Sequence, residues 1–164
     1  MRSQIPVFSH QLSNDEFLHL IPDAFQSVVF GTVDAAGNPR TNVADIELKA
    51  DDRLIFATSY QKPFYQRLKG HPQISLTALK GDETLNSVGF DLIGIASEVG
   101  AKYLDQIFQQ HPEMQQISGH NHSERRGLLR TFAIKPLRGS IYDLRQDPIF
   151  QQRLTFDTGK WDQP

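Results

Sequence analysis

The sequence predicts a mainly β protein, in which about six strands form a closed or half-open antiparallel barrel with inserted helices. Short segments rich in β-branched residues alternate apolar and polar side chains, which is typical of half-buried strands. Tight turns containing Gly, Asn, Asp and Pro connect most of these segments, and this favours hairpins over a parallel α/β sheet. No change in composition marks a second domain. We therefore expect a single domain over residues 1–164, with an N-terminal helical segment (1–25), a barrel (26–145) and a C-terminal tail (146–164).

The N-terminal segment contains a helix start signal. Ser13 followed three residues later by Glu16 is a capping box, in which each side chain accepts from the other residue's backbone N–H. Phe17, Leu20 and Ile21 then recur with helical spacing. We expect a short amphipathic helix that stops before Pro22.

Three strands are expected next, at residues 26–34, 40–49 and 53–58. The turns between them are Ala35 to Asn38 and Ala50 to Asp52. Because these connections are short, we predict an antiparallel meander in which each strand pairs with the next.

The stretch from Thr58 to Pro72 reads as a strand end followed by a helix with both ends marked. Pro63 suits the first helical position, and Gly70 suits a left-handed residue just past the end. Phe64 and Leu68, four residues apart, can share a buried face. The helix start would place free backbone N–H groups beside the side chains of Thr58, Ser59, Gln61 and Lys62. That combination favours a phosphate, although a capped surface helix with a solvated Lys gives the same local pattern.

The remaining elements alternate between strands and one further helix. Strands are expected at residues 73–79, 84–99 and 128–143, with a short strand-like piece at 153–156. Gly89 and Gly94 inside the second of these indicate barrel curvature or a ligand lying close to the backbone. Residues 101–110 form a helix with Leu104, Ile107, Phe108 and His111 on one face, and residues 113–127 read as an exposed loop.

Composition excludes several classes of protein. The chain has no cysteine, so disulfides, thiolate metal sites and Cys nucleophiles are excluded, and a reducing cytoplasm fits. The formal charge of −2 and the absence of a long basic run argue against nucleic-acid and anionic-membrane binding. No apolar run approaches the length of a membrane span or of a signal-peptide core.

The histidines do not form a recognisable metal site, and no metal is expected. His120 and His122 could act with His111, yet no pattern of carboxylates completes a ligand set. Solvated loop histidines are the simpler interpretation. A second possibility is a polar rim of His120, His122, Arg125 and Arg126 that recognises a substrate over a cleft.

An ordered set of local motifs is carried by residues 26–143. These are a Gly-Asn-Pro-Arg turn (37–40), a strand ending Phe-Ala-Thr (56–58), a Lys-bearing helix closing in Gly-His-Pro (70–72), an Ile-Ser-Leu strand (74–76) and a Gly-Ile-Ala strand (94–96). In this order they resemble the pyridoxamine 5′-phosphate oxidase-like proteins. The resemblance implies a six-stranded antiparallel split β-barrel of the FMN-binding type.

The resemblance also implies which residues bind the cofactor. The FMN phosphate would lie at Thr58, Ser59, Gln61 and Lys62, where the residues alone indicate an anion site. The backbone of Arg40, Thr41, Asn42, Val43 and Ala44 would lie along the isoalloxazine ring, with donors aimed at its pyrimidine edge. Asp45 should then point away from the ring.

Family members are typically homodimers with the flavin between subunits. Phe90 and the tail, including Trp161, are candidates to close the site from the partner chain; Phe90 as ordinary core and Trp161 as a disordered end are the alternatives. The chain lacks the Arg-rich C-terminal segment of the namesake oxidase, and Pro63 and Phe64 replace its basic phosphate-binding pair. Pyridoxamine phosphate is therefore not the expected substrate.

The function implied is that of a cytoplasmic FMN-dependent oxidoreductase. It would transfer electrons or a hydride to or from a small conjugated substrate, with a nicotinamide or reduced flavin as donor. One alternative is a non-catalytic flavin-binding or redox-sensing module, and another is a haem-binding or haem-degrading barrel. No catalytic residue is assigned, because the ring carries flavin chemistry and the protein supplies position and electrostatics.

Overall fold

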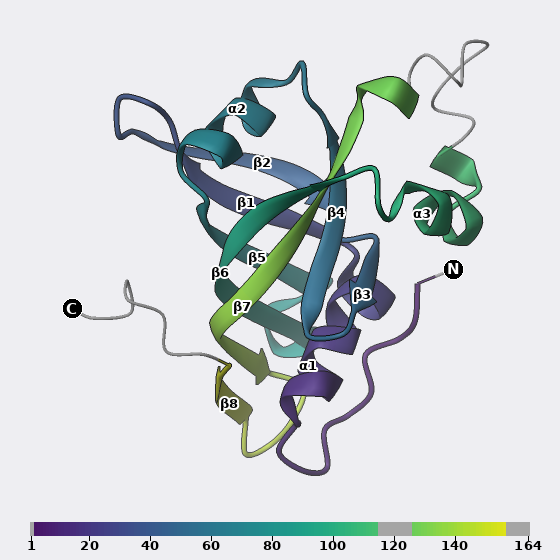
Figure 1. The fold of residues 1–164 in the computed structure, drawn as a ribbon. Helices are drawn as coiled ribbons and strands as arrows, with labels where there is room; N and C mark the ends of the chain where they lie inside the picture. Colours follow the sequence, from purple (N-terminus) through teal and green to yellow (C-terminus); the bar gives the residue numbers. More distant parts are fainter. Residues whose placement is uncertain (1, 115–125, 157–164) are drawn as a thin grey trace.

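The computed structural model describes residues 2–114 and 126–156, which form one antiparallel sheet with helices at its ends (Figure 1). The sheet has eight strands in the order β2-β1-β5-β6-β7-β4-β3, and β8 pairs with β7 beside this path. The elements are α1 (Asn14–Leu20), a π-helical turn η1 (Ile21–Phe25), β1 (Ser27–Val33), β2 (Pro39–Asp45), β3 (Leu48–Ala50), β4 (Arg53–Ser59), α2 (Pro63–Gly70), β5 (Gln73–Gly81), a 3-10 turn η2 (Thr84–Asn86), β6 (Ser87–Gly100), α3 (Leu104–Gln110), β7 (Leu129–Asp143) and β8 (Phe150–Thr155).

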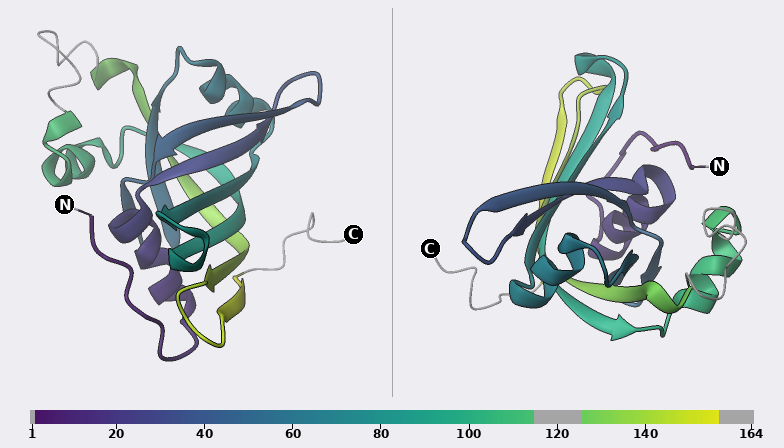
Figure 2. Two further views of the ribbon diagram at one scale, coloured as in Figure 1. Left: turned by 180° about the vertical axis from the view of Figure 1, so that it is seen from behind. Right: turned by 90° about the horizontal axis from the view of Figure 1, so that it is seen from above.

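The predicted class, an antiparallel barrel with inserted helices, is confirmed. The strand number is higher than expected because residues 40–49 form two strands, β2 and β3, and because the tail adds β8. Two helical elements lie at opposite ends of the curved sheet, α2 at the top of Figure 1 and α1 at the bottom; Figure 2 shows the same arrangement from behind and from above.

The two pairings of the predicted meander are confirmed, but its second strand, residues 40–49, is divided into β2 and β3. β2 pairs with β1, but β4 pairs with β3 and β7 instead of β2. The chain changes partner at two consecutive residues. The Ile46 N–H donates to the Gln26 carbonyl beside β1 at 2.8 Å, whereas the Glu47 N–H donates to the Ile55 carbonyl of β4 at 2.8 Å. β2 therefore ends as one outer edge of the sheet and β3 begins as the other.

The long strand β6 bends at Gly94, as its glycines predicted. The register with β7 shifts between Ile93 and Gly94, where Arg138 and Pro136 are successive partners, so Leu137 is the extra residue of a β-bulge. A Cβ on Gly94 would lie 2.6 Å from the Lys135 carbonyl oxygen. The strands approach too closely there for any side chain.

The helix ends differ from expectation at two points. The capping box of Ser13 and Glu16 is present. The helix was expected to stop before Pro22, but helical structure continues through Pro22 into η1. Pro22 lies in the first positions of η1, where a missing N–H costs no hydrogen bond, and the Gln26 N–H closes the turn on the Ile21 carbonyl at 2.7 Å. Gly70 is the last residue of α2 and does not have positive φ; His71, in an extended conformation, is the C-cap.

Helix α3 packs on the outside of the sheet. Its Ile107 forms a small buried cluster with Leu48 of β3 and Ile55 of β4. The predicted inward face is confirmed, since Leu104, Ile107 and Phe108 are all buried. Among the described helices, none is long and apolar enough to cross a membrane.

The main core lies inside the curved sheet and is rich in aromatic rings. Phe30 of β1 is fully buried, with its ring centroid 4.8 Å from that of Phe56 and 5.2 Å from that of Phe64. Phe56 stacks on Phe132 of β7 at 5.4 Å. Phe64 and Leu68 are both buried, which confirms the predicted inward face of α2. These contacts fix α2 against the strands that surround the candidate site.

Truncation of Phe30 tests this packing. We expect Phe30→Ala to lower the free energy of unfolding by about 3–5 kcal/mol, because a large ring is lost without room for the site to collapse. The measurement is urea unfolding followed by circular dichroism. Val7→Ala, at a site 67% exposed, is the control and should change stability by no more than about 0.5 kcal/mol. Equal losses in both variants would contradict the assigned core.

Candidate functional site

The predicted phosphate residues lie where β4 runs into α2. Lys62 is the N-cap residue of α2, and Pro63 follows at the first helical position. The Lys62 ammonium makes no hydrogen bond or ion pair within the described ranges, so its charge is available to a ligand. Thr58 is buried at the end of β4, and its neighbour Ser59 is half-buried.

The turn that precedes α2 uses two of its own amides. The Gln61 N–H donates to the Ser59 hydroxyl at 3.3 Å and the Lys62 N–H donates to the Ser59 carbonyl at 3.1 Å, so Ser59 organises the turn. The first intrahelical bond runs from the Gln66 N–H to the Lys62 carbonyl. In the first turn of α2, the amides of Phe64 and Tyr65 therefore have no acceptor among the described residues.

Strand β2 presents its backbone at an open edge of the sheet. At the hairpin the Asp34 N–H donates to the Asn38 carbonyl at 3.0 Å, and at the other end the Ile46 N–H donates to the Gln26 carbonyl. Because hydrogen-bonded pairs alternate along an antiparallel ladder, the even-numbered residues of β2 bond to β1. The N–H and C=O groups of Thr41 and Val43 consequently face outward, where no described strand pairs with them.

An arginine that the sequence reasoning missed joins α2 to this strand. The Arg67 Nε donates to the Thr32 hydroxyl at 2.8 Å, and its guanidinium also donates to the Asn42 side-chain carbonyl at 3.1 Å. Arg67 lies three residues after Phe64 and one before Leu68, so helical periodicity places it beside the buried face of α2. Arg40, in contrast, pairs with Asp34 of its own hairpin at 3.1 Å.

A second group of charges fixes the outer side of α2. Glu98 of β6 accepts from the Tyr65 hydroxyl at 2.8 Å and from the Lys69 ammonium at 2.9 Å. The Lys69 hydrogen bond lowers the pKa of Glu98, and the bond to Glu98 raises the pKa of Tyr65. Arg130 lies opposite Thr58 in the β4–β7 register, with its guanidinium 4.9 Å from the centre of the Tyr60 ring. It is a further cation near the candidate site.

Two further residues, Phe90 and Asp45, point away from the start of α2 and the outer edge of β2. Phe90 is 2% exposed, and its ring packs on Phe25 at 4.8 Å and on Phe17 at 6.0 Å, near the end capped by α1. It is a core residue, and we do not carry it into the proposed site. The Asp45 carboxylate accepts from the Ser27 hydroxyl at 2.6 Å and from the Gln26 amide, so it is turned toward the start of β1.

Comparison with known proteins identifies the family of this chain. A family model described as pyridoxamine 5′-phosphate oxidase matches residues 14–142, from α1 to the penultimate residue of β7. The chain belongs to the pyridoxamine 5′-phosphate oxidase-like family. A search of curated proteins found no match to the sequence.

Several solved structures share the fold at low sequence identity. A haem-binding protein of Mycobacterium smegmatis has a TM-score of 0.66 and 13% identity, over 89% of this chain and 59% of that protein. A pyridoxamine 5′-phosphate oxidase-related, FMN-binding protein of Nostoc punctiforme has a TM-score of 0.54 and 12% identity, over 81% and 87%. The haem storage protein HutZ of Vibrio cholerae has a TM-score of 0.51 and 17% identity, over 68% and 81%. These likenesses establish the fold.

The histidine and arginine candidates separate into two groups. His120, His122 and Arg125 lie outside the described residues. Arg126 pairs with Asp105 of α3 and lies 5.3 Å from the centre of the Phe108 ring. His111 ends α3 and contacts Glu47 and Glu113. Within the residues that the structure describes, no group of three His, Asp or Glu side chains could hold a metal ion.

The contact between Glu47 and His111 couples protonation to stability. Burial raises the pKa of Glu47 to about 7, with the His111 charge opposing this and the charges of Asp45 and Glu113 adding to it. Burial lowers the pKa of His111, but the hydrogen bond to the Glu47 carbonyl and the charges of Glu47 and Glu113 outweigh it, so the net shift is upward. Both groups therefore hold a proton more tightly in the folded state than in the unfolded state.

The sign of the pH dependence follows from these two shifts. Stability from the pair is fully present below the unfolded Glu pKa of 4.5 and is lost as the pH rises through about 7. Between pH 5 and pH 8 we expect the free energy of unfolding to fall by about 2–3 kcal/mol more in the wild type than in Glu47→Gln. Urea unfolding across this range measures it. Parallel pH profiles for the two proteins would refute the assignment.

Proposed function

We propose that the chain binds FMN at the outer edge of β2 and the start of α2, and acts as an FMN-dependent oxidoreductase. The observation that carries this proposal is the open edge of β2, with the outward backbone groups of Thr41 and Val43, next to a helix start that carries an unpaired Lys62. The family match adds independent support, because the family model covers both elements.

The residues present fit the two ends of FMN. The phosphate, a doubly charged ester, would be held by the Lys62 ammonium and by the free amides of Phe64 and Tyr65, at the positive end of the helix dipole. The backbone N–H groups of Thr41 and Val43 would donate to the pyrimidine edge of the ring. Arg67 would act as a positioning residue, because it holds the Asn42 side chain and ties α2 to β2.

Bound FMN would supply hydride or electron transfer with a small conjugated substrate. The chain's own part is to orient the ring and to favour its reduced, anionic form. Outward N–H donors stabilise negative charge on the pyrimidine edge. The Asp45 carboxylate would oppose that charge if it faced the ring, and its hydrogen bonds to Ser27 and Gln26 hold it on the β1 side.

A homodimer would complete the site. Val43 of β2, Val29 of β1 and Leu79 of β5 share one outer face of the sheet in the observed register, and they are 68%, 37% and 64% exposed. An apolar sheet face of this kind favours a second copy of the chain as its cover. The edge of β2 would then be covered by the partner subunit, and the substrate would enter from the remaining open side.

A haem-binding role is the second candidate, because two of the structural neighbours are a haem-binding protein and a haem storage protein. A redox-sensing, non-catalytic flavoprotein is a third. Absorbance of the purified protein separates haem from flavin, since haem gives a Soret band and FMN gives bands in the blue and near ultraviolet. Reduction by a nicotinamide followed by reoxidation on an added acceptor separates an enzyme from a binding module. A Soret band without flavin bands would overturn the proposal.

The phosphate assignment is tested by Lys62→Ala. Losing one charged hydrogen bond to the phosphate should cost about 1.5–3 kcal/mol, which is more than a tenfold loss of FMN affinity. Titration with FMN, followed by quenching of flavin fluorescence, measures the dissociation constant. Riboflavin, which lacks the phosphate, should bind the wild type and the variant with equal affinity.

Lys102→Ala is the matched control for charge. Lys102 is exposed before α3 and lies over the Tyr103 ring at 4.9 Å, away from α2. Its loss should change FMN affinity by no more than about twofold, because a distant exposed charge is screened by salt. If Lys62→Ala bound FMN as tightly as Lys102→Ala does, the phosphate would not lie at the start of α2.

A further inference from the structure

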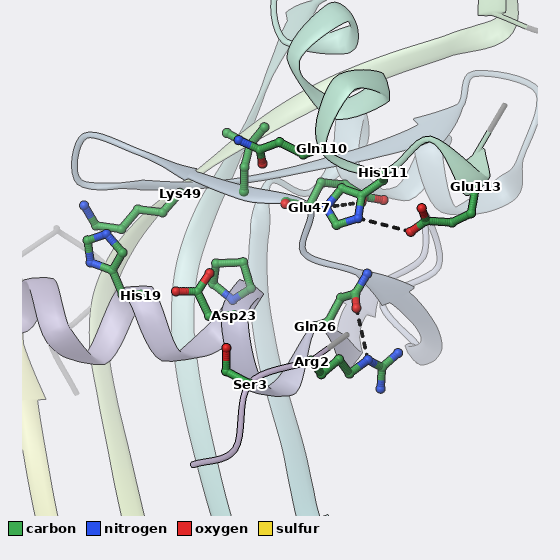
Figure 3. Close-up of a pocket in the computed structure, with 12 residues that line it drawn as sticks. Arg2, Ser3, His19, Asp23, Gln26, Glu47, Lys49, Gln110, His111 and Glu113 are labelled. Atoms are coloured by element: carbon green, nitrogen blue, oxygen red, sulfur yellow. Dashed lines mark hydrogen bonds and ion pairs between the residues drawn. The ribbon is translucent and has the colours of Figure 1, made fainter. Parts of the chain in front are cut away.

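A cavity lies on the far side of the residues that link β2 to β3. It has a volume of about 650 Å³. It is bounded by the N-terminal residues Arg2 and Ser3, by α1 and η1, by β3 and by the end of α3 (Figure 3). Its lining residues are mostly polar or charged, and none is among those proposed to bind FMN.

Glu47 is the feature of this cavity that calls for a ligand. Its side chain is only 7% exposed, yet its carboxylate accepts no hydrogen bond from any described residue. The nearest partner is the His111 Nε2, at 3.6 Å from the Glu47 Oε2. That nitrogen lies 3.0 Å from the Glu47 backbone carbonyl, and the His111 Nδ1 is 3.3 Å from Glu113. A buried carboxylate without a donor is costly, so the site favours a ligand that supplies one.

The other charges around the cavity indicate the sign of that ligand. Lys49 pairs with Asp15 at 2.7 Å, and His19 also pairs with Asp15, at 3.2 Å. Arg2 donates to Gln26 and to Ser27. These three basic groups therefore have partners.

The carboxylates around the cavity have fewer hydrogen-bond and ionic partners. The Asp23 side chain, which Figure 3 shows near the centre of the cavity, makes no hydrogen bond or ion pair with the residues described. Asp45 adds further negative charge near Glu47. The carboxylates of this cavity thus lack positively charged partners and N–H donors.

We propose that this cavity binds a small organic cation that carries a protonated amine or guanidine, with Glu47 as its principal partner. The ammonium would donate to the buried carboxylate that the fold leaves without a hydrogen bond. Asp23, which also lines the cavity, would attract a second positive group at the other end of the ligand. The inference does not depend on flavin binding, since the two sets of residues are separate.

The probe is 1,4-diaminobutane, with 1,4-butanediol as its neutral equivalent of the same length. Titrations followed by ¹H–¹⁵N NMR, at about 150 mM salt to screen surface charges and at a pH near 8 where Glu47 is ionised, should give saturable shifts around Glu47, Asp23 and His111. The diol should give none. We expect Glu47→Gln to weaken binding of the diamine at least tenfold, equivalent to about 1.4 kcal/mol.

Glu83→Gln is the control, because Glu83 is exposed and its loss changes the net charge equally. Glu47→Gln should fold, since it replaces a buried charge with an uncharged group of the same shape, and the NMR spectrum verifies this. Binding of the diamine that is equal in Glu47→Gln and Glu83→Gln would overturn the proposal as non-specific charge attraction. A dissociation constant of about 10 mM corresponds to a single weak contact. If the wild type shows no saturable shifts up to that concentration of diamine, the proposal is overturned directly.

Discussion

The structure depends on the change of hydrogen-bond partner at Ile46 and Glu47. The N–H of one residue bonds to the β1 side of the sheet and the N–H of the next bonds to β4. Ile46 is fully buried and Glu47 nearly so, which fixes the chain at this point. A continuous strand over the same residues would have paired with β1 alone. The change instead leaves β2 as an open edge and starts β3 on the opposite edge of the sheet.

Both proposed sites are consequences of that change. On one side, the open edge of β2 exposes the backbone of Thr41 and Val43 to a flavin ring, beneath a helix whose start carries Lys62. On the other side, the change brings Glu47 inside, where His111 at the end of α3 is its only described ionic partner. The aromatic core under Phe30 and Phe64 packs α2 against the strands, which fixes the helix relative to β1 and β4.

Sequence patterns predicted the helices and strands themselves better than they predicted which strands pair with one another. The helix at Pro63–Gly70 and the bulged strand around Gly94 could be read locally, because proline, glycine and alternation act over a few residues. The break at Ile46 could not be read in this way. Alternation of apolar and polar residues indicates which face of the sheet a side chain occupies, but it does not indicate which strand lies beside it. Arg67 was missed for the same reason: its partners Thr32 and Asn42 are distant in sequence. Glu47 read as an ordinary polar strand position, and only the packing of α3 shows its burial.

The most direct test of the central claim is amide hydrogen exchange along β2, measured by NMR before and after FMN is added. In the free protein, the amides of Asn42 and Ala44 should already exchange slowly, because they bond to β1, while those of Thr41 and Val43 exchange fast. We expect FMN to slow the exchange of the Thr41 and Val43 amides selectively. Saturating FMN that leaves both of these amides in fast exchange would contradict it.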